Sequence, residues 1–271
     1  MSRSLPNAER YDRFVLTSAN LLIETNTRAD RHLRIPSQHD RLASHIQAFR
    51  WIELELGRRA ATHVIGLQEL QITDDHHNGE DLLKSMNHSF GLWHPHSRKS
   101  SGEHIGAISS RDPDSSEIIP LDNNRYALAL RFGQFCVTVA HPIYSDAKRR
   151  AKQYDALLEY LEDEPYAALI GDLNEEPLPF SSRRKLGKIG LESAFTRTHQ
   201  GHPVTLPTPA YKPYRSWPAR IGFELLGGGL RYDDIYVSQA MKVDMAGTIT
   251  ADSDHRFVYA DIRTPVGIFR Q

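Results

Sequence analysis

The sequence predicts an α/β protein, and three observations indicate it. Apolar runs of strand length alternate along the chain with amphipathic stretches of helix length. Most of these apolar runs end in a polar or charged residue, as strands do when a site lies at the edge of a sheet. The 271 residues show no sharp change of composition and no low-complexity linker, so we expect one domain over residues 1–271.

The N-terminal part contains two predicted strands with a helix between them. The runs RFVLTSANLL (13–22) and THVIGLQEL (62–70) are typical of buried strands. Ser37 suits an N-cap and Gly57 a helix end, so the stretch between them is predicted to be helical. Its apolar residues keep roughly one face, which we expect to pack on the strands: Leu42, Ile46, Phe49 and Leu56.

The middle of the chain predicts three more strands and a second helix. HIGAISS (104–110) is a short strand, and residues 126–142 form two strands joined by a tight turn near Gly133. Asp146 suits the N-cap of the helix that follows. We expect its inner face to comprise Ala147, Ala151, Tyr154, Leu158 and Leu161.

The C-terminal part predicts a strand, a long irregular region and two final strands. YAALIGDLN (166–174) is the first of these strands, and RYDDIYVS (231–238) and HRFVYADI (255–262) close the chain. Residues 175–230 are rich in proline, glycine and aromatics. An irregular region of that length is usually functional, so we expect a substrate-facing surface with some short structure inside it.

Composition indicates a soluble protein in a reducing compartment. Cys136 is the single cysteine, so no disulfide can form within the chain, and the N-terminus lacks an apolar signal core. The sequence contains no apolar run long enough to span a membrane. We therefore expect a cytoplasmic location and no obligate protein partner. The formal net charge is −1, so any contact with nucleic acid must come from local patches.

Polar residues that a packed core would not select stand at the strand ends. In a strand, alternate side chains project to the same side, so Asp172 and Asn174 should share one side. Each such residue alone is explained by hydrogen bonding to a loop, but together they form a set of carboxylates, amides and imidazoles. Carboxylate and amide oxygens suit Mg²⁺ or Mn²⁺. The set comprises Asn20, Glu69, His141, Asp172, Asn174, Asp233, Asp254 and His255.

These residues carry a resemblance to the endonuclease/exonuclease/phosphatase superfamily, whose members are similar to the pancreatic-type deoxyribonucleases. The matching blocks occur in the family's order from about residue 14 to residue 262, and their order is more specific than any one of them. The resemblance implies a four-layer α/β sandwich, in which two face-to-face mixed β-sheets are flanked by helices and the site lies at one end. The blocks are SANLL, LQEL, GEHIGAISS, VAHP, GDLN, RYDDIYVS and SDH.

The resemblance also implies roles for five of the residues. Glu69 matches the main metal-ligand carboxylate, and Asn20 supports the metal or the phosphate from the neighbouring strand. Asp254 holds metal or the catalytic histidine. Asp172 matches the residue that orients or deprotonates the attacking water, while Asn174 contacts the phosphoryl oxygens.

Two histidines and an acid complete the implied catalytic set. His255 stabilises charge on the phosphate or transfers a proton, and His141 matches the histidine of the deoxyribonuclease-like and phosphatase-like branches. The AP endonuclease branch tends to have a tyrosine at the latter position. Asp233 matches the acid that orients His141. Asp234 stands where the family usually has an aromatic, so either acid can face the site.

The expected activity is divalent-metal-dependent hydrolysis of phosphodiester bonds, with Mg²⁺ or Mn²⁺ as cofactor and in-line attack by water. The expected partner is a phosphoester substrate, with nucleic acid or a nucleotide-like ester first. An alternative within the same chemistry is a phosphomonoesterase or a lipid phosphoesterase of sphingomyelin or inositol type. A different alternative is a catalytically inactive binding module. The complete set of site residues argues against inactivity.

Weaker candidates for substrate binding are Arg149, Tyr211 and Trp217. Arg149 belongs to a basic run on a predicted helix, where a solvated helix face is the competing interpretation. The two aromatics lie in the irregular region, where they either stack on substrate or pack the loop. A second basic run, RRKLGK (183–188), offers a further phosphate contact, and Glu24 offers a further carboxylate or only a strand end.

Overall fold

The computed structural model describes residues 11–21, 38–56, 61–72, 78–95, 103–122, 125–175, 181–200, 203–205, 231–251, 253 and 255–265. Several residues singled out in the sequence lie outside this description, namely Glu24, Ser37, Gly57, Tyr211, Trp217 and Asp254. Among the helices of the described residues, none is long and apolar enough to cross a membrane.

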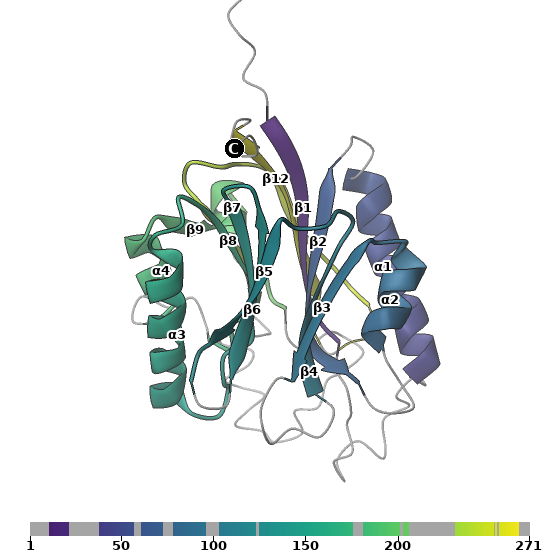
Figure 1. Ribbon diagram of the computed structural model, residues 1–271, viewed down its shortest axis with the longest axis horizontal. Coiled ribbons are helices and arrows are strands. Elements are labelled where there is room, and N and C mark those ends of the chain that lie inside the picture. The colour runs from purple at the N-terminus through teal and green to yellow at the C-terminus, as the bar shows by residue number, and fades with distance from the viewer. Residues whose placement is uncertain are drawn as a thin grey trace, which may run out of the picture.

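Two six-stranded β-sheets pack face to face, with helices on both outer sides (Figure 1). The first sheet has the order β11-β12-β1-β2-β4-β3 and the second the order β5-β6-β7-β8-β10-β9. The helices α1 and α2 lie outside the first sheet, and α3 and α4 outside the second (Figure 1). The predicted four-layer α/β sandwich is therefore confirmed.

The bounds of the elements are as follows. The strands of the first sheet are β1 (Tyr11–Asn20), β2 (Thr62–Gln71), β3 (Phe90–Pro95), β4 (Glu103–Ser109), β11 (Lys242–Ile249) and β12 (Phe257–Pro265). Those of the second are β5 (Ser115–Pro120), β6 (Tyr126–Phe132), β7 (Phe135–Ala140), β8 (Tyr166–Asp172), β9 (Leu191–Ser193) and β10 (Asp233–Ser238). The helices are α1 (Gln38–Leu56), α2 (Asn78–Met86), α3 (Ala147–Leu161), α4 (Arg184–Lys188) and α5 (Ala194–Arg197).

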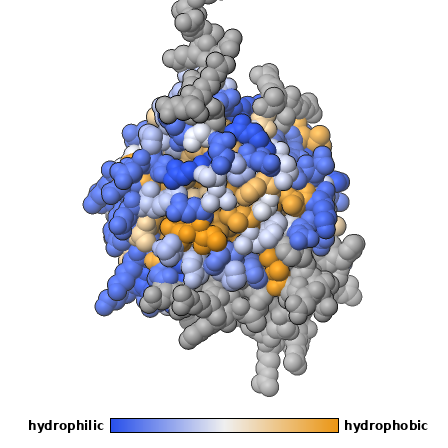
Figure 2. Space-filling model, viewed as in Figure 1, coloured by the Kyte–Doolittle hydropathy of each residue, from blue (hydrophilic) through white to orange (hydrophobic). Residues whose placement is uncertain are grey.

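The main core lies between the two sheets. Phe14 of β1 contacts two aromatic rings of the opposite sheet, at 5.5 Å from Phe132 and 4.7 Å from Phe135 between centroids. Separate apolar clusters lie beneath the outer helices. Figure 2 shows a polar surface over these helices and an apolar patch near the edge strand β5. This double burial explains why the sheet strands are almost continuously apolar.

The structure corrects the predicted inner face of α3. Ala147 is exposed, whereas Gln153, Tyr154, Leu157 and Leu161 are buried. Tyr154 and Leu161 are buried as predicted, and Gln153 joins them because it accepts a hydrogen bond from the backbone of Ile143. A polar contact, which a hydrophobic pattern does not detect, therefore adds to the buried face of this helix.

Strand direction brings the strand ends together. The strands β1 and β2 are parallel, as are β7 and β8, so all four end at one end of the sandwich. The antiparallel strand β10 begins there, with Asp233 paired opposite Asp172. The chain thus collects polar residues from both sheets at a single edge.

Candidate active site

The backbone places His141 beside Asp172 through the pairing of β7 with β8. Ala140 pairs with Gly171, and the two site residues follow directly. A Cβ added at Gly171 would lie 1.9 Å from the carbonyl oxygen of Ala140. No other residue fits there without separating the strands, which explains the glycine of the GDLN motif.

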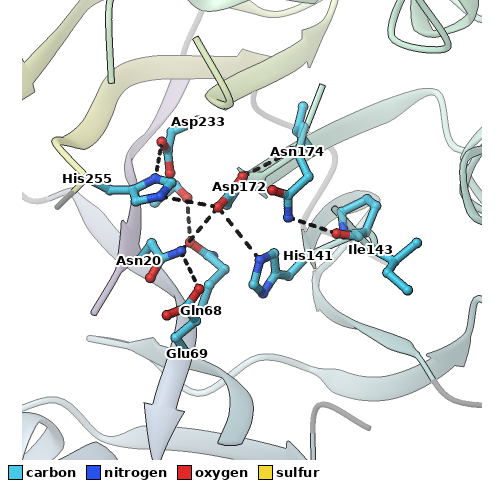
Figure 3. Close-up of polar contacts among 12 residues, drawn as sticks. Asn20, Gln68, Glu69, His141, Ile143, Asp172, Asn174, Asp233 and His255 are labelled. Carbon is cyan, nitrogen blue, oxygen red and sulfur yellow. Dashed lines mark hydrogen bonds and ion pairs between the residues drawn. The ribbon is translucent and has the colours of Figure 1, made fainter. Parts of the chain in front are cut away.

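Asp172 is the centre of the site, and four residues surround its buried carboxylate (Figure 3). Its Oδ1 accepts a hydrogen bond of 3.0 Å from the backbone N–H of Asn174. Its Oδ2 accepts one of 3.1 Å from Nδ2 of Asn20. The same oxygen lies 3.6 Å from Nε2 of His141 and 3.7 Å from Nε2 of His255. Two imidazoles from different sheets therefore face one carboxylate oxygen.

Asn20 connects this carboxylate to Glu69. Its Nδ2 donates to Oε1 of Glu69 at 3.1 Å as well as to Asp172. The backbone carbonyl oxygen of Asn20 accepts a hydrogen bond of 2.7 Å from the hydroxyl of Ser253. The same hydroxyl oxygen accepts a hydrogen bond from the backbone N–H of His255. One buried amide thus fixes two carboxylates relative to each other.

Asp233 orients His255 and not His141, which corrects the sequence assignment. Its Oδ2 lies 2.7 Å from Nδ1 of His255, and a carboxylate can only accept, so this nitrogen carries a proton. Asp234 instead forms a buried ion pair with Arg183. The structure therefore settles which of the two adjacent acids faces the site.

Arg183 belongs to the second basic run, for which the sequence offered a phosphate contact or a solvated face, but its side chain is buried and structural. Besides Asp234, its guanidinium donates to the hydroxyl of Tyr236 at 3.2 Å. It also donates to the carbonyl oxygens of Glu175 and Arg231 at 2.8 and 2.6 Å. Asp234 accepts further hydrogen bonds from Ser193 and from the backbone of Ile235. This network supports β10 from behind, one residue away from Asp233.

Two site residues have left-handed backbone conformations, which are uncommon outside glycine. The φ angles are 53° at Glu69 and 51° at Asn174. The pairing of β2 with β4 shifts register between Leu67 and Leu70, so Glu69 lies in an irregularity of the strand. Such conformations concentrate at functional sites, because the surrounding structure must hold them.

Asn174 also fixes the loop that follows His141. Its Nδ2 donates to the carbonyl oxygen of Pro142 at 2.9 Å. The next residue in that loop, Ile143, donates its backbone N–H to Oε1 of the buried Gln153 at 2.7 Å. The loop is thereby tied to β8 and to α3, and nothing in the sequence pattern predicted this role of Gln153.

The donor set fits a divalent cation. Asp172, Asp233 and His255 are buried, and their ligand atoms lie within 4.8 Å of one another. Within the described residues, Oδ1 of Asp233 is buried and accepts no hydrogen bond. A buried carboxylate oxygen without a donor is stabilised by a cation. Asn20 joins this group to Glu69, the carboxylate for which the sequence predicted the main metal contact.

Of the three predicted substrate contacts, Arg149 is paired within the protein and the two aromatics lie outside the described residues. Nε and Nη2 of Arg149 donate to the two carboxylate oxygens of Asp122, at 2.6 and 2.9 Å. This pair raises the pKa of Arg149 and holds the loop after β5, so the side chain is engaged within the protein. Tyr211, Trp217 and Asp254 lie outside the described residues.

One known protein family shares this fold and matches most of this chain. The model of the Endonuclease/Exonuclease/phosphatase family matches residues 24–255, and the chain belongs to that family. Members of the family hydrolyse phosphoester bonds. A search of curated proteins found no match.

Solved structures with the same fold include proteins from bacteria and from fish. One is an endonuclease/exonuclease/phosphatase family protein from Bacteroides thetaiotaomicron, with 14% identity, a TM-score of 0.66, and 95% of this chain and 100% of that chain covered. Another is the 3′ phosphatase NExo from Neisseria bound to product DNA hairpin. It has 18% identity and a TM-score of 0.60, and the match covers 91% of this chain and 98% of that chain. A third is D. rerio TDP2 complexed with single strand DNA product. It has 15% identity and a TM-score of 0.60, and the match covers 93% of this chain and 99% of that chain.

Proposed function

We propose that this protein is a divalent-metal-dependent phosphoesterase that hydrolyses phosphodiester bonds of nucleic acid or nucleotide-like substrates. The convergence of two imidazole nitrogens and one amide on Oδ2 of Asp172 carries the proposal. Hydrolysis of a phosphoester requires an oriented water, donors to the phosphoryl oxygens and neutralisation of developing charge. This one cluster offers groups for all three.

Asp172 is the group that orients the attacking water and accepts its proton. Its Oδ1 is occupied by the N–H of Asn174, so Oδ2 is the oxygen that faces the imidazoles. The imidazole nitrogens lie too far away for direct hydrogen bonds of normal length. An oxygen atom of water or phosphate in front of Oδ2 would therefore be within reach of these groups.

The two histidines donate to the phosphoryl oxygens. Asp233 keeps a proton on Nδ1 of His255 and favours the charged ring, so Nε2 can carry a second proton toward the substrate. His141 presents Nε2 to the same oxygen of Asp172 from the other sheet. Proton transfer or donation by such a group contributes about 10²- to 10⁴-fold.

Glu69 is the carboxylate that would hold Mg²⁺ or Mn²⁺, and Asn20 fixes it relative to Asp172. Asp233 and His255, whose ligand atoms lie within 4.8 Å of Asp172, would flank the cation on the other side of that carboxylate. When bound, the cation supplies positive charge to the phosphoryl oxygens. The chain itself supplies the base, the proton donors and their orientation.

Nucleic acid is the favoured substrate class because two similar structures contain a DNA product. A phosphomonoester is the second candidate, since one of these proteins is a 3′ phosphatase. The two candidates use the same donors and differ in the groups that contact the remainder of the substrate.

The test is a substrate panel with Mg²⁺, Mn²⁺ or EDTA: plasmid DNA, single-stranded DNA, RNA, a phosphomonoester and sphingomyelin. We expect metal-dependent turnover of DNA or RNA. Turnover confined to the monoester would establish the second candidate, and turnover of sphingomyelin alone would establish a lipid phosphoesterase. Absence of metal-dependent turnover throughout would leave an inactive binding module.

The matched variants are Asp172→Asn and Asp155→Asn. The first should lower turnover about 10²- to 10⁴-fold by removing the base. The second removes an exposed acid that binds Lys185 on the surface and should leave turnover unchanged. Equal effects of the two substitutions would contradict the role of Asp172.

A further inference from the structure

An aromatic pair lies next to the site and was not singled out in the sequence. Tyr144 follows His141 by three residues, and Tyr232 immediately precedes Asp233. The two rings lie 5.9 Å apart between centroids, at an interplanar angle of 54°. The carbonyl oxygen of Tyr232 accepts a hydrogen bond of 2.9 Å from the N–H of Leu173, next to the catalytic carboxylate. Each tyrosine is therefore joined through the backbone to a residue of the active site.

The loop that carries Tyr144 is held in place. Nη1 of Arg150 donates to the carbonyl oxygens of Tyr144 and Ile143 at 2.7 and 3.2 Å. Gln153 accepts from the N–H of Ile143, and Asp146 caps the helix directly after the loop. The backbone at Tyr144 is thus fixed from α3, although the side chain is 62% exposed.

The position of this exposed ring distinguishes it from the others. Five large hydrophobic or aromatic side chains are exposed within the described part of the chain, namely Trp51, Leu54, Ile118, Tyr144 and Met245. The other four lie on α1, β5 and β11. Only Tyr144 lies on a loop that begins with a residue of the active site. An exposed aromatic held rigidly at such a place loses little conformational entropy when it binds a flat ligand.

We infer that Tyr144, with Tyr232 behind it, is a stacking site for an unpaired nucleobase next to the scissile phosphate. This inference rests on the proposed function and names its substrate class: nucleic acid with an accessible base, such as a single strand or a frayed end. A base within a duplex is covered on both faces by its neighbours, so it cannot stack on a protein side chain. Stacking of this kind tolerates every base, because each has a π face.

The test compares two substrates that differ only in their bases. One is a ten-residue oligothymidylate, and the other is the same phosphodiester chain built from abasic tetrahydrofuran units. Tyr144→Ala should lower kcat/KM for the oligothymidylate about 5- to 150-fold, which is the range for loss of one stacked base. It should change kcat/KM for the abasic chain less than twofold. Tyr144→Phe, which keeps the ring, should stay close to the parent on both.

Trp51→Ala is the control, because Trp51 is an exposed aromatic on α1, where it packs on Tyr259. Trp51→Ala should leave kcat/KM unchanged for both the oligothymidylate and the abasic chain. Binding of the same two oligonucleotides, measured by fluorescence anisotropy in EDTA, gives a readout that needs no turnover. The parent should bind oligothymidylate more tightly than the abasic chain, and Tyr144→Ala should remove that difference.

The inference is overturned if Tyr144→Ala has no effect, or if it weakens both substrates equally. It is also overturned if the parent binds the two oligonucleotides with equal affinity. Failure of the proposed function gives another pattern, in which no substrate of the panel is hydrolysed although the base-dependent difference in binding is present. The two proposals therefore fail independently.

Discussion

Two acid–histidine clusters of the described residues lie near opposite ends of β2, and only the one around Asp172 has its central acid held by hydrogen bonds from an amide side chain and the backbone. The first is the active-site cluster around Asp172, near the end of β2 at Gln68 and Glu69. The second comprises Glu53 of α1, His63 near the start of β2 and His88 after α2. Oε1 of Glu53 lies 3.6 Å from Nδ1 of His63 and 3.4 Å from Nε2 of His88.

The two clusters differ in how their charges are supported. In the first, hydrogen bonds from Asn20 and from the backbone of Asn174 fix the central carboxylate, and Asp233 fixes one imidazole. In the second, Nδ1 of His88 contacts the carbonyl oxygen of Met86 at 3.1 Å, so its Nε2 faces Glu53 as an acceptor. An ionised Glu53 has no proton to donate to that nitrogen, so no hydrogen bond with His88 holds the charged form of this acid.

Burial therefore dominates the second cluster. It raises the pKa of Glu53 to about 7 and lowers that of His63 to about 4, and it also lowers the pKa of His88. The neutral forms are favoured there. Proximity of acids and histidines therefore does not by itself make a site, because hydrogen bonds must also hold the charged forms in place.

Substitution of the acids that support each cluster should show the largest difference. Asp233→Asn should lower kcat about 10²- to 10⁴-fold, because the imidazole of His255 loses its orientation and its charge stabilisation. Glu53→Gln should change kcat less than twofold. Steady-state assays of both purified variants check this, and a large loss of kcat in Glu53→Gln would remove the distinction between the clusters.

The support behind the active site should make a large contribution to stability. Arg183→Met leaves Asp234 buried without its cation, so we expect a loss of about 3–5 kcal/mol in the free energy of unfolding. Urea denaturation measures it. Lys185→Met is the control, because Lys185 pairs with an exposed acid at the surface. This substitution should lower the free energy of unfolding by about 0–1 kcal/mol, as is typical of exposed ion pairs. A loss below about 1 kcal/mol for Arg183→Met would contradict this account.

Glu53→Gln should stabilise the protein at alkaline pH. The pKa of Glu53 is raised in the folded state, so its contribution to stability is present below its unfolded pKa and is lost as the pH rises through about 7. Glutamine does not ionise. Allowing for partial exposure, we expect a gain of about 1–2 kcal/mol at pH 8 and almost none at pH 4.5. Urea denaturation at the two pH values tests this, and an equal effect at both would contradict it.

His63→Gln should show the smallest effect, on the acid side. The pKa of His63 is lowered in the folded state, so its contribution is present above its unfolded pKa and is lost as the pH falls toward about 4. The free energy of unfolding of the variant minus that of the parent should be about 1 kcal/mol larger at pH 5 than at pH 8. Parallel denaturation curves of the parent and the variant measure the difference, and His94→Gln on the edge strand β3 is the control. A pH-independent difference would exclude titration of His63 as its cause.

Much of the fold and most of the site could be predicted from the sequence. The buried strands were visible as apolar runs, and the order of the polar residues at their ends identified the family. Figure 3 shows that the structure brings Asn20, Glu69, His141, Asp172, Asn174 and His255 together as expected. These residues were predictable because each lies at or just beyond a strand end whose direction follows from the fold.

Partners across the chain could not be predicted in the same way. The choice of His255 as the partner of Asp233 depends on β10 beginning where β12 also begins, in the opposite sheet. The pairing of Arg149 with Asp122 joins residues 27 positions apart. A basic run looks the same in sequence whether its side chains bind substrate, face solvent or bind an acid from another loop.

The absence of a side chain at Gly171 has a consequence for any redesign of this protein. Because an added Cβ at Gly171 would meet the carbonyl oxygen of Ala140, the two strands can approach this closely only with a glycine at that position. We expect the close pairing of these strands, which sets where the Cα atoms of residues 141 and 172 lie, to persist when the side chains at those two positions are exchanged. New chemistry can therefore be introduced by changing those two positions, provided that the glycine is kept.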